Sequence, residues 1–323
     1  MKKIFLFGGK LHGYEKIIID NFTNKGYEVI FFDYNSKNKY KKARKIKNPF
    51  LNLYNNIFLK KFKGMNLKDK LEADELNKDL LKIEENYDCF IKIGPIILQE
   101  STLKILKNRF PVLISHHWDT INSNKEKIIL LEKRFFDKVS SYSKKDCEKY
   151  DLAYLPNFYF KKEDKSIKIE NDVFGITSDF TRINFLEKIA KELKKNDIKY
   201  SINLITDKNI ESKWINISKN PWNIEEVLKA YSKSRTVLEL VRKEHEGSYT
   251  FRAIECIGLN KKLITNNKEI INENFYNKNN ILIIDEENMI IPKKFIYSKY
   301  EKLSEKVEEE YNIENWIKKI IKI

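Results

Sequence analysis

The polar loop at residues 242–247 carries the side chains best suited to bind a phosphorylated ligand. It follows an apolar run at 236–241 and leads into an apolar pattern of helical spacing that begins near 248–250. Three of the chain's seven arginines, Arg235, Arg242 and Arg252, fall within 18 residues here. Arginine binds a diphosphate through paired hydrogen bonds, and free N–H groups at a helix start also attract anions. We therefore predict an anion site, and the alternative is a solvated loop.

Two polar segments in the first half of the chain could supply a general base. His12 lies in the Gly-rich turn at residues 8–13, which does not fit the GxGxxG dinucleotide pattern. Asp119 ends the run Ser-His-His-Trp-Asp at 115–119. We interpret His116 and His117 as ligand contacts, and Trp118 could stack on a ligand ring. A histidine or carboxylate that faces a ligand can accept its proton. We predict His12 and Asp119 as catalytic; the alternatives are a surface histidine in a turn and plain packing of residues 115–119.

The histidines and cysteines form no pattern typical of metal binding. The four histidines lie outside any HExxH or HxxxH motif, so we predict no metal site. The three cysteines are far apart and odd in number, which argues against a disulfide framework and fits a reducing cytoplasm. The chain also lacks a GxSxG motif and a Walker A motif.

Residues 247–267 resemble a known enzyme family. They read Gly-Ser-Tyr-Thr-Phe-Arg-Ala-Ile-Glu at 247–255 and Lys-Lys-Leu-Ile-Thr-Asn-Asn at 261–267. This pattern resembles bacterial GT-B glycosyltransferases encoded with genes for capsule, lipopolysaccharide and exopolysaccharide synthesis. Weaker matches at 136–139, 143–146 and 154–156 extend the resemblance over residues 111–285. Many retaining members carry two glutamates eight positions apart; here Glu246 and Glu255 are nine apart, so the stereochemistry stays open.

The resemblance implies a nucleotide-sugar donor in the C-terminal half, acceptor contacts in the N-terminal half and no obligatory metal or other cofactor. Arg252 would neutralise the diphosphate, and Glu255 would accept hydrogen bonds from the ribose hydroxyls. Their spacing of three residues places them on one face of a helix. The predicted donor-binding residues are Arg242, His245, Glu246, Gly247, Ser248, Tyr249, Thr250, Arg252, Glu255, Asn266 and Asn267.

Alternating strands and helices must position these residues. Short apolar runs alternate with stretches of helical period through residues 1–158, and the pattern restarts after the Lys-rich stretch 161–171. We predict an α/β protein of GT-B type: two Rossmann-like domains, an acceptor-side domain at 1–158 and a nucleotide-sugar-binding domain at 173–299, with a cleft between them. We expect one helix at 300–323, which could pack back on the first domain. The expected strands are 3–7, 28–34, 89–93, 112–115, 138–142, 153–155, 173–177, 200–205, 236–241, 262–265 and 281–284.

The formal net charge is +15, from 62 Lys and Arg against 47 Asp and Glu. The basic residues are spread along the chain without a nucleic-acid-binding motif, so we do not expect a nucleic-acid partner. Residues 37–63 differ, because a Lys-rich stretch accompanies apolar residues at helical spacing over 50–62. We weigh a helix packed on its own domain against peripheral contact with anionic membrane. Since no apolar stretch of about 18 residues exists, we expect a cytoplasmic protein, with any such contact at the inner face of the plasma membrane.

Together these patterns predict transfer of a sugar from a nucleotide-diphosphate sugar to a surface-glycan or lipid-linked glycan acceptor. The basic cluster would stabilise the departing diphosphate. Two alternatives remain. One is another GT-B enzyme, such as a nucleotide-sugar epimerase or a polyol-phosphate transferase. The other is a glycan-assembly or binding protein without catalytic activity.

Overall fold

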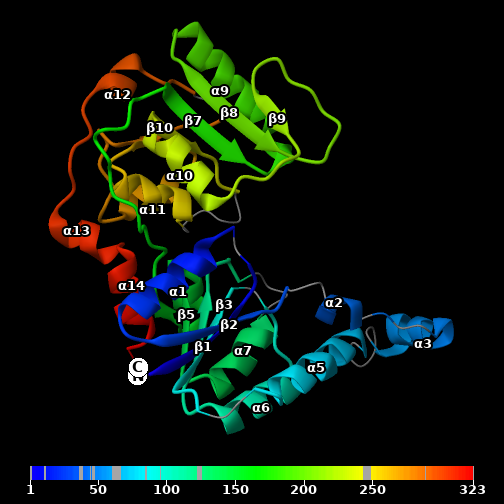
Figure 1. Ribbon diagram of the computed structural model, residues 1–323. Helices are drawn as coiled ribbons and strands as arrows, with labels where there is room; N and C mark the ends of the chain where they lie inside the picture. The colour runs from blue at the N-terminus through cyan, green and yellow to red at the C-terminus, as the bar shows by residue number, and fades with distance from the viewer. Residues whose placement is uncertain are drawn as a thin grey trace. The chain divides into compact units, whose positions relative to one another are not determined.

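The protein divides into two compact units, each with one parallel sheet (Figure 1). Unit 1 comprises Met1–Tyr142, Asp146–Leu155 and Lys319–Ile323, and unit 2 comprises Ser143–Lys145 and Pro156–Lys318. The computed structural model describes residues 2–10, 12–35, 39–43, 45, 48–59, 67–83, 86–94, 96–121, 126–242, 249–287 and 289–322.

Unit 1 is built on a sheet with the strand order β2-β1-β3-β4-β5-β6. Its strands are β1 (Lys3–Gly8), β2 (Glu28–Asp33), β3 (Cys89–Ile93), β4 (Leu113–His117), β5 (Lys138–Ser141) and β6 (Ala153–Tyr154). The helices described along this part of the chain are α1 (Tyr14–Asn24), α2 (Lys39–Ala43), α3 (Pro49–Tyr54), the π-helix η2 (Asn55–Leu59), α5 (Leu67–Leu80), α6 (Glu100–Arg109), α7 (Glu126–Phe135) and α8 (Lys144–Tyr150). The chain places β2 on one side of β1 and β3 on the other, so the topological switch point lies between β1 and β3.

Aromatic side chains fill the core of unit 1. Alternation along β1 sends Phe5 and Phe7 to the face on which α5 and α6 pack. Phe5 stacks on Phe90 of β3 with ring centroids 5.8 Å apart, and Phe110 at the end of α6 packs against both rings. Because both faces of a parallel sheet are covered, the middle of β1 is a continuous apolar run from Ile4 to Phe7, which is the signal that the sequence shows.

Unit 2 is built on a sheet with the strand order β12-β11-β10-β7-β8-β9. Its strands are β7 (Asn171–Thr177), β8 (Tyr200–Ile205), β9 (Asn216–Ser218), β10 (Ser234–Glu239), β11 (Lys262–Thr265) and β12 (Ile281–Ile283). The described helices are η4 (Phe180–Arg182), α9 (Ile183–Lys195), α10 (Ile224–Ser232), α11 (Phe251–Gly258), η6 (Lys268–Asn272), α12 (Lys293–Tyr297), α13 (Glu305–Glu310) and α14 (Ile313–Ile320). The chain runs outward from β7 through β8 to β9 and then resumes at β10 on the other side of β7. The switch point of this sheet therefore lies between β7 and β10.

Helix ends in unit 2 are set by local side chains. Asn223 and Glu226 form a reciprocal capping box at the start of α10. The buried face of α9 carries Leu186, Ile189 and Leu193, which pack into the core with residues of β7, β8 and β10. Such capping and burial fix the helices against the sheet and so fix the loops at its edge.

Several expected elements differ in the structure. The expected single helix at 300–323 is wrong: α13 and α14 are separate short helices, because the chain bends at Tyr311 and Asn312 to pair with Tyr159. Lys319–Ile323 belongs to unit 1, where Lys138 Nζ donates to the backbone oxygen of Lys322 at 2.8 Å. The expected helix over 50–62 is, within the described residues, α3 followed by η2. β9 was not expected, because three polar residues give no strand pattern.

Candidate functional site

The carboxyl ends of β7 and β10 meet at the switch point of the unit 2 sheet. The strands pair in parallel, so the residues that follow them lie at one edge. Asp179 lies two residues beyond β7, and Arg242 lies three residues beyond β10. Arg242 Nε donates to Asp179 Oδ2 at 2.8 Å and so joins the two loops. Ligands of doubly wound sheets bind at this place.

Asp179 also holds a second arginine. Arg182 Nε lies 3.1 Å from the same Oδ2 atom, and Asp179 caps η4 by accepting hydrogen bonds from the backbone N–H and the hydroxyl of Thr181. Burial alone would raise the pKa of Asp179, but the hydrogen bonds from Thr181 and Arg242 and the charge of Arg182 lower it to about 2. The carboxylate is therefore ionised at neutral pH and fixes both guanidinium groups.

Arg252 in the first turn of α11 brings a third cation. Thr250 caps this helix, and its hydroxyl accepts a hydrogen bond from the backbone N–H of Arg252 at 3.2 Å. Burial lowers the pKa of Arg182; Asp179 raises it, and the charges of Arg252 and Arg242 lower it further. Arg182 therefore lies within electrostatic range of both Arg242 and Arg252. We call Arg182, Arg242 and Arg252 the arginine cluster.

Glu239, the last residue of β10, is buried beside the arginine cluster with 2% of its surface exposed. The Thr250 hydroxyl donates to its carboxylate, which ties the start of α11 to the end of β10. Burial raises the pKa of Glu239, against the hydrogen bond from Thr250 and the charge of Arg252. Glu255, one helical turn after Arg252, is a third buried carboxylate in this neighbourhood. A guanidinium group carries five N–H donors, so an arginine can pair with a carboxylate and still bind an anionic ligand.

Asn266 and Asn267 follow β11 at the same edge. Asn266 Oδ1 accepts from the N–H of Val241 at 2.7 Å, and its Nδ2 donates to the carbonyl of Val241 at 3.0 Å. Asn267 is buried, and its backbone N–H donates to the Thr265 hydroxyl at 3.2 Å. Asn266 therefore fixes the start of the loop that carries Arg242. Direct contact of either asparagine with a ligand stays a prediction.

Glu255 and Tyr249 are buried on either side of the start of α11. Tyr249 donates to the carbonyl of Glu269 at 3.2 Å and packs edge-on against Phe275, which anchors the chain ahead of the helix. Glu255 lies one helical turn after Arg252, and 2% of its surface is exposed. Burial raises the pKa of Tyr231 well above its ordinary value; Arg252 lowers it and Glu255 raises it. Both charged side chains thus lie near this fully buried tyrosine, whose hydroxyl has no hydrogen-bond partner among the described residues.

Four predicted donor residues, His245, Glu246, Gly247 and Ser248, lie outside the described residues. The grouping of Arg235 with the other two arginines is wrong. Arg235 lies near the start of β10, at the amino ends of the strands and away from the arginines at their carboxyl ends. Its Nε lies 3.1 Å from Asp172 Oδ1.

The predicted base candidates of unit 1 lie on its surface. His12 is exposed in the turn after β1 and has a positive φ of 54°. Asp119 is exposed two residues beyond β4. Trp118, by contrast, is buried against Gly94; a Cβ at Gly94 would lie 3.1 Å from Trp118 Nε1, and the φ of 97° at Gly94 also requires glycine.

The interpretation of His116 and His117 as ligand contacts is corrected, because both are buried in β4. β4 extends two residues farther than expected, which moves both histidines from the loop into the sheet. His116 Nδ1 lies 3.0 Å from the Ser140 hydroxyl of β5. Burial and the charges of His117, Lys92 and Lys138 lower the pKa of His116 to about 3, so it is neutral at pH 7.

His117 belongs to a buried ionic network with Lys92, Ser115 and Glu132. Glu132 Oε2 accepts from His117 Nε2 at 2.7 Å and from the Ser115 hydroxyl at 3.0 Å, while its Oε1 lies 3.0 Å from Lys92 Nζ. Lys92 and Glu132 are both fully buried. Burial alone would raise the pKa of Glu132, but Lys92 and His117 lower it to about 2. Lys92 Nζ also donates to the carbonyl of Gly94 at 3.3 Å, so the network holds the loop after β3.

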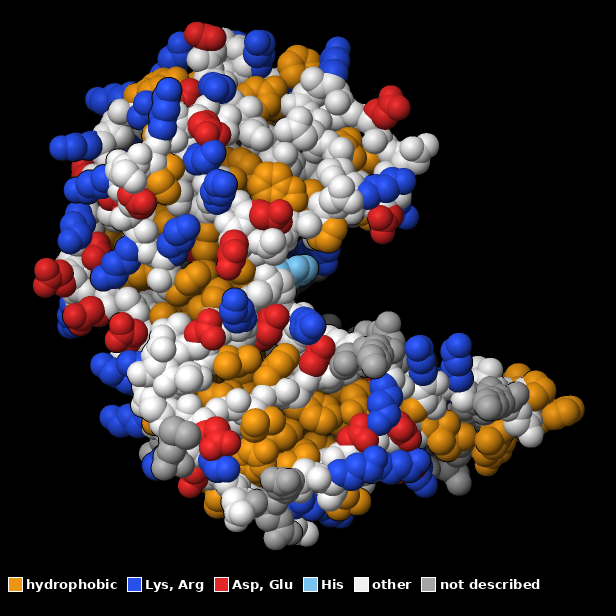
Figure 2. All heavy atoms as spheres, viewed as in Figure 1, with side chains coloured by type: hydrophobic (Ala, Val, Ile, Leu, Met, Phe, Trp, Pro, Cys, Tyr) orange, Lys and Arg blue, Asp and Glu red, His pale blue; other side chains and the backbone are white. Residues whose placement is uncertain are grey.

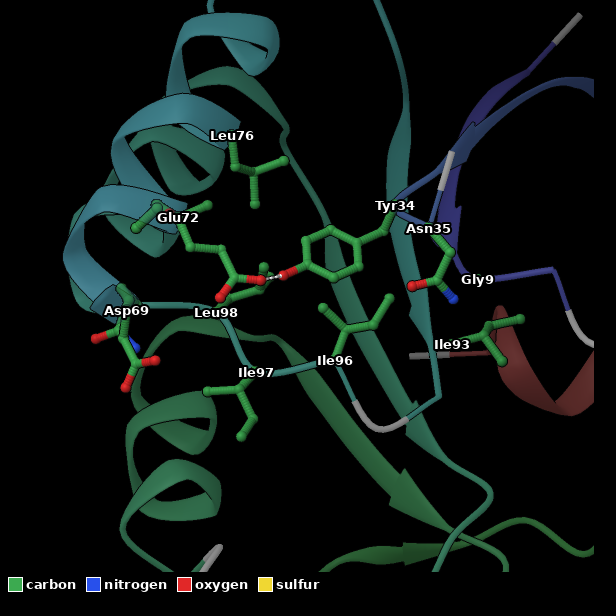
Figure 3. A pocket seen from close by; sticks show the side chains of 13 residues that line it. Gly9, Tyr34, Asn35, Asp69, Glu72, Leu76, Ile93, Ile96, Ile97 and Leu98 are labelled. Carbon is green, nitrogen blue, oxygen red and sulfur yellow. Dashed lines mark hydrogen bonds between the residues drawn. The ribbon is translucent and has the colours of Figure 1, made fainter. Parts of the chain in front are cut away.

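A cavity of about 400 Å³ lies within unit 1 at the carboxyl ends of its first strands (Figure 3). Its apolar wall comes from the loop after β3 and from α5, namely Ala73, Leu76, Ile93, Ile96, Ile97 and Leu98. Its polar groups include Asp69 and Glu72 of α5 and Tyr34 and Asn35 after β2. The Tyr34 hydroxyl donates to the Glu72 carboxylate (Figure 3). The cavity therefore combines an apolar wall with acidic hydrogen-bond acceptors.

Sequence reasoning missed several of these residues. Asp179 lies two residues beyond the predicted strand at 173–177, so the strand-end argument applied to His12 and Asp119 would have found it, and Arg182 follows three residues later. Glu239 closes an apolar strand and was not distinguished from it. Glu72 gave no signal, because an acidic residue on an amphipathic helix is ordinarily solvated.

Among the described residues, no group of three or more His, Cys, Asp and Glu side chains could hold a metal ion. No described helix is long and apolar enough to cross a bilayer.

Comparison with known proteins finds solved structures with a similar fold. No protein-family model and no curated protein matches the chain. Anabaena HepE in complex with UDP-glucose has a TM-score of 0.59 and 11% identity, over 99% of this chain and 98% of that chain. A UDP-GlcNAc 2-epimerase from Neisseria meningitidis bound to UDP-GlcNAc has a TM-score of 0.55 and 11% identity, over 99% and 98%.

An α-glucosyltransferase in complex with UDP and a mismatched DNA has a TM-score of 0.55 and 16% identity, over 90% of this chain and 88% of that chain. At these identities the likeness concerns the fold alone. The prediction of an α/β protein of GT-B type with two Rossmann-like domains is confirmed.

Proposed function

We propose that this protein is a glycosyltransferase that moves a sugar from a nucleotide-diphosphate donor to a surface-glycan or lipid-linked glycan acceptor. The observation that supports this most is the arginine cluster of unit 2. Arg182 and Arg242 share Asp179 at the switch point, and Arg252 joins them from the start of α11. A second support is the GT-B fold, which this chain shares with HepE, a protein solved in complex with UDP-glucose.

In this proposal the arginine cluster stabilises the leaving group. Cleavage of the bond between the sugar and the diphosphate places negative charge on the phosphate oxygens. Guanidinium groups held by Asp179 are oriented before the reaction, so they need no reorganisation as the charge develops. Because the cluster supplies this charge, we propose that turnover needs no metal ion and that a chelator leaves the rate unchanged.

Glu255 is proposed to hold the ribose of the donor. Glu255→Ala is expected to weaken nucleotide binding by about 1–3 kcal/mol, because a hydrogen bond to a charged acceptor would be lost. Calorimetric titration with the nucleotide, on variants whose circular dichroism matches the native protein, measures this. Glu255→Gln keeps the shape and one acceptor oxygen, so it should lose less than the alanine variant. Unchanged affinity in Glu255→Ala with the fold intact would place the donor elsewhere.

The cavity of unit 1 is proposed to receive the acceptor sugar. A sugar ring has an apolar face that could lie on Ile96 and Ile97, and its hydroxyl groups could donate to Glu72 and Asp69. The same carboxylates would repel a phosphate group. The acceptor portion bound here is therefore a neutral or amino sugar rather than a phosphorylated one.

His12 and Asp119 are proposed as the candidate bases for the acceptor hydroxyl. Removal of a general base lowers turnover about 10²-fold or more. His12→Ala and Asp119→Ala, assayed at saturating donor, should identify which of the two acts, because the base variant loses turnover with little change in donor affinity. Near-normal turnover in both variants would show that the base is another residue.

Incubation with a panel of nucleotide sugars tests the function, beginning with UDP-sugars because HepE and the epimerase were solved with them. Transfer to a glycan or slow donor hydrolysis supports the proposal. An isomerised donor sugar would support the second candidate, a nucleotide-sugar epimerase, whose fold the chain shares. Transfer of a polyol phosphate to the acceptor would indicate the related transferase. Saturable binding without any turnover would indicate a binding protein.

A further inference from the structure

The segment formed by α3 and η2 exposes an unusual set of large apolar side chains. The exposed fractions are 81% for Phe50, 44% for Leu51, 57% for Leu53, 46% for Tyr54 and 42% for Ile57. We call these five residues the apolar tip. Figure 2 shows hydrophobic side chains gathered over α3 at the end of unit 1. Exposed apolar clusters of this kind mark interaction sites more often than isolated apolar residues do.

The apolar tip is held in place without being part of a core. Asn48 caps α3 by accepting from the backbone N–H of Phe50 and of Leu51, at 2.9 and 3.2 Å, and Pro49 favours the first helical turn. No residue of α3 is buried. The helix is therefore an ordered element whose apolar side chains face solvent.

The stretch of sequence that contains the apolar tip carries charge of one sign. Residues 37–63 contain ten Lys and Arg and no Asp or Glu. Lys42 and Lys45 are exposed, whereas Lys39 pairs with Asp79 and Glu75 of α5. A second copy of this chain would bring the same positive charge to a symmetric contact and be repelled.

We infer that the apolar tip inserts into the interfacial region of an anionic lipid bilayer while the surrounding lysines contact the lipid headgroups. The apolar side chains suit the acyl chains of the bilayer, and the flanking cations suit its anionic headgroups. Phe50 and Leu53 reach the acyl boundary, and Lys42 and Lys45 stay with the anionic headgroups. This docking stands independently of the proposed function.

One hydrogen bond ties the helical segment of the apolar tip to α5, the helix that lines the cavity of unit 1. Asn55, which is buried at the start of η2, accepts from the backbone N–H of Leu67 at 2.7 Å. Leu67 begins α5, and Asp69 and Glu72 in its first turns line the cavity. Docking would therefore hold this cavity at the membrane. If the proposed function holds, the acceptor is lipid-linked.

Co-sedimentation of the full chain with vesicles tests the docking. At low salt the native protein should bind vesicles of phosphatidylcholine mixed with phosphatidylglycerol and bind pure phosphatidylcholine at least about tenfold more weakly, with binding reduced by added salt. The double variant Phe50→Ser/Leu53→Ser should lose about tenfold or more in affinity for the mixed vesicles. Lys42→Glu/Lys45→Glu should lose about tenfold or more by removing and reversing the charge.

A matched control is Leu81→Ser/Leu130→Ser, which removes two similarly exposed leucines elsewhere in unit 1 and should bind like the native protein. Equal binding of the native protein to neutral and anionic vesicles, or native affinity in Phe50→Ser/Leu53→Ser, would overturn the inference. Self-association lost in that variant, without vesicle binding, would assign the apolar tip to a protein contact instead. Nucleotide titration of the same variants separates this result from a failure of the donor site.

Discussion

Arg252→Ala is expected to lower the rate of donor turnover by about 10²–10³-fold, the range found when one preorganised charge stabiliser is removed. Arg252 lies at the start of α11, where Thr250 and Glu239 fix the helix to the end of β10. The charge on the departing diphosphate grows as the sugar bond breaks. An arginine that faces these oxygens therefore contributes more in the transition state than in the ground state.

The kinetic pattern identifies this role. The turnover number should fall more than the half-saturation concentration of the donor rises, as measured by steady-state release of the nucleotide. Arg235→Ala is the matched control, because Arg235 pairs with Asp172 at the opposite edge of the same sheet and should leave turnover near the native value. A raised half-saturation concentration with an unchanged turnover number would mean that Arg252 only binds the donor. Native kinetics in Arg252→Ala would mean that the arginine cluster is not the donor site.

The sequence was most informative about buried strands. The expected strands at 89–93, 200–205 and 262–265 match β3, β8 and β11 residue for residue. A strand covered on both faces is rich in apolar residues. Residues that break the strand pattern follow each of these three: Gly-Pro after β3, Thr-Asp after β8 and Asn-Asn after β11. β9 shows the converse, because Asn216–Ser218 at the sheet edge is too short and too polar to give this signal.

The candidate site was less predictable because its parts come from distant segments. Arg242 and Arg252 share one loop-helix connection and could be predicted together. Asp179 lies 63 positions before Arg242 and meets it only because β7 and β10 pair in parallel. Pairing of strands that are not consecutive is a property of the topology, which local periodicity does not encode.

His116 and His117 show that a small error in a predicted strand boundary can change the role assigned to a residue. Two additional residues in β4 place these side chains inside a sheet covered on both sides. Histidine types at a strand end were interpreted as ligand contacts, yet they pair with Ser140 and Glu132. A polar residue near a strand end indicates a ligand contact only when it lies in the loop beyond the strand and not within the strand itself.

Removing one partner from the buried ionic network of unit 1 should strongly destabilise the protein. Glu132→Gln is expected to lower the free energy of unfolding by about 3–5 kcal/mol, because Lys92 would remain buried without a countercharge. Denaturant titration followed by circular dichroism measures this change. A loss of this size is a large part of the stability of an ordinary domain.

The double variant Lys92→Met/Glu132→Gln separates the charge effect from packing. Both partners are fully buried, so replacing the pair by neutral side chains removes the uncompensated charge. We expect the double variant to be more stable than Glu132→Gln alone. If the two variants are equally unstable, the loss comes from packing or from the His117 hydrogen bond and not from the charge on Lys92.

The same network and its neighbour His116 predict how acid destabilises the protein. The folded pKa of His116 is about 3 against an ordinary 6.5, so the neutral form is favoured on folding, and stability is lost as the pH falls below 6.5. By pH 5 the loss is about 2 kcal/mol. The folded pKa of Glu132 is about 2 against 4.5, so its contribution is present above pH 4.5 and is lost as the pH falls from 4.5 toward 2.

Variants at the histidines assign the first phase of this acid effect. His116→Asn can retain the contact with Ser140 but has no titrating group, so its stability should fall less between pH 7 and 5 than that of the native protein. His12→Asn changes an exposed histidine and should keep the native pH profile. Comparing slopes with pH cancels any constant cost of the substitution. Parallel pH profiles for the native protein and His116→Asn would show that another group takes up the proton.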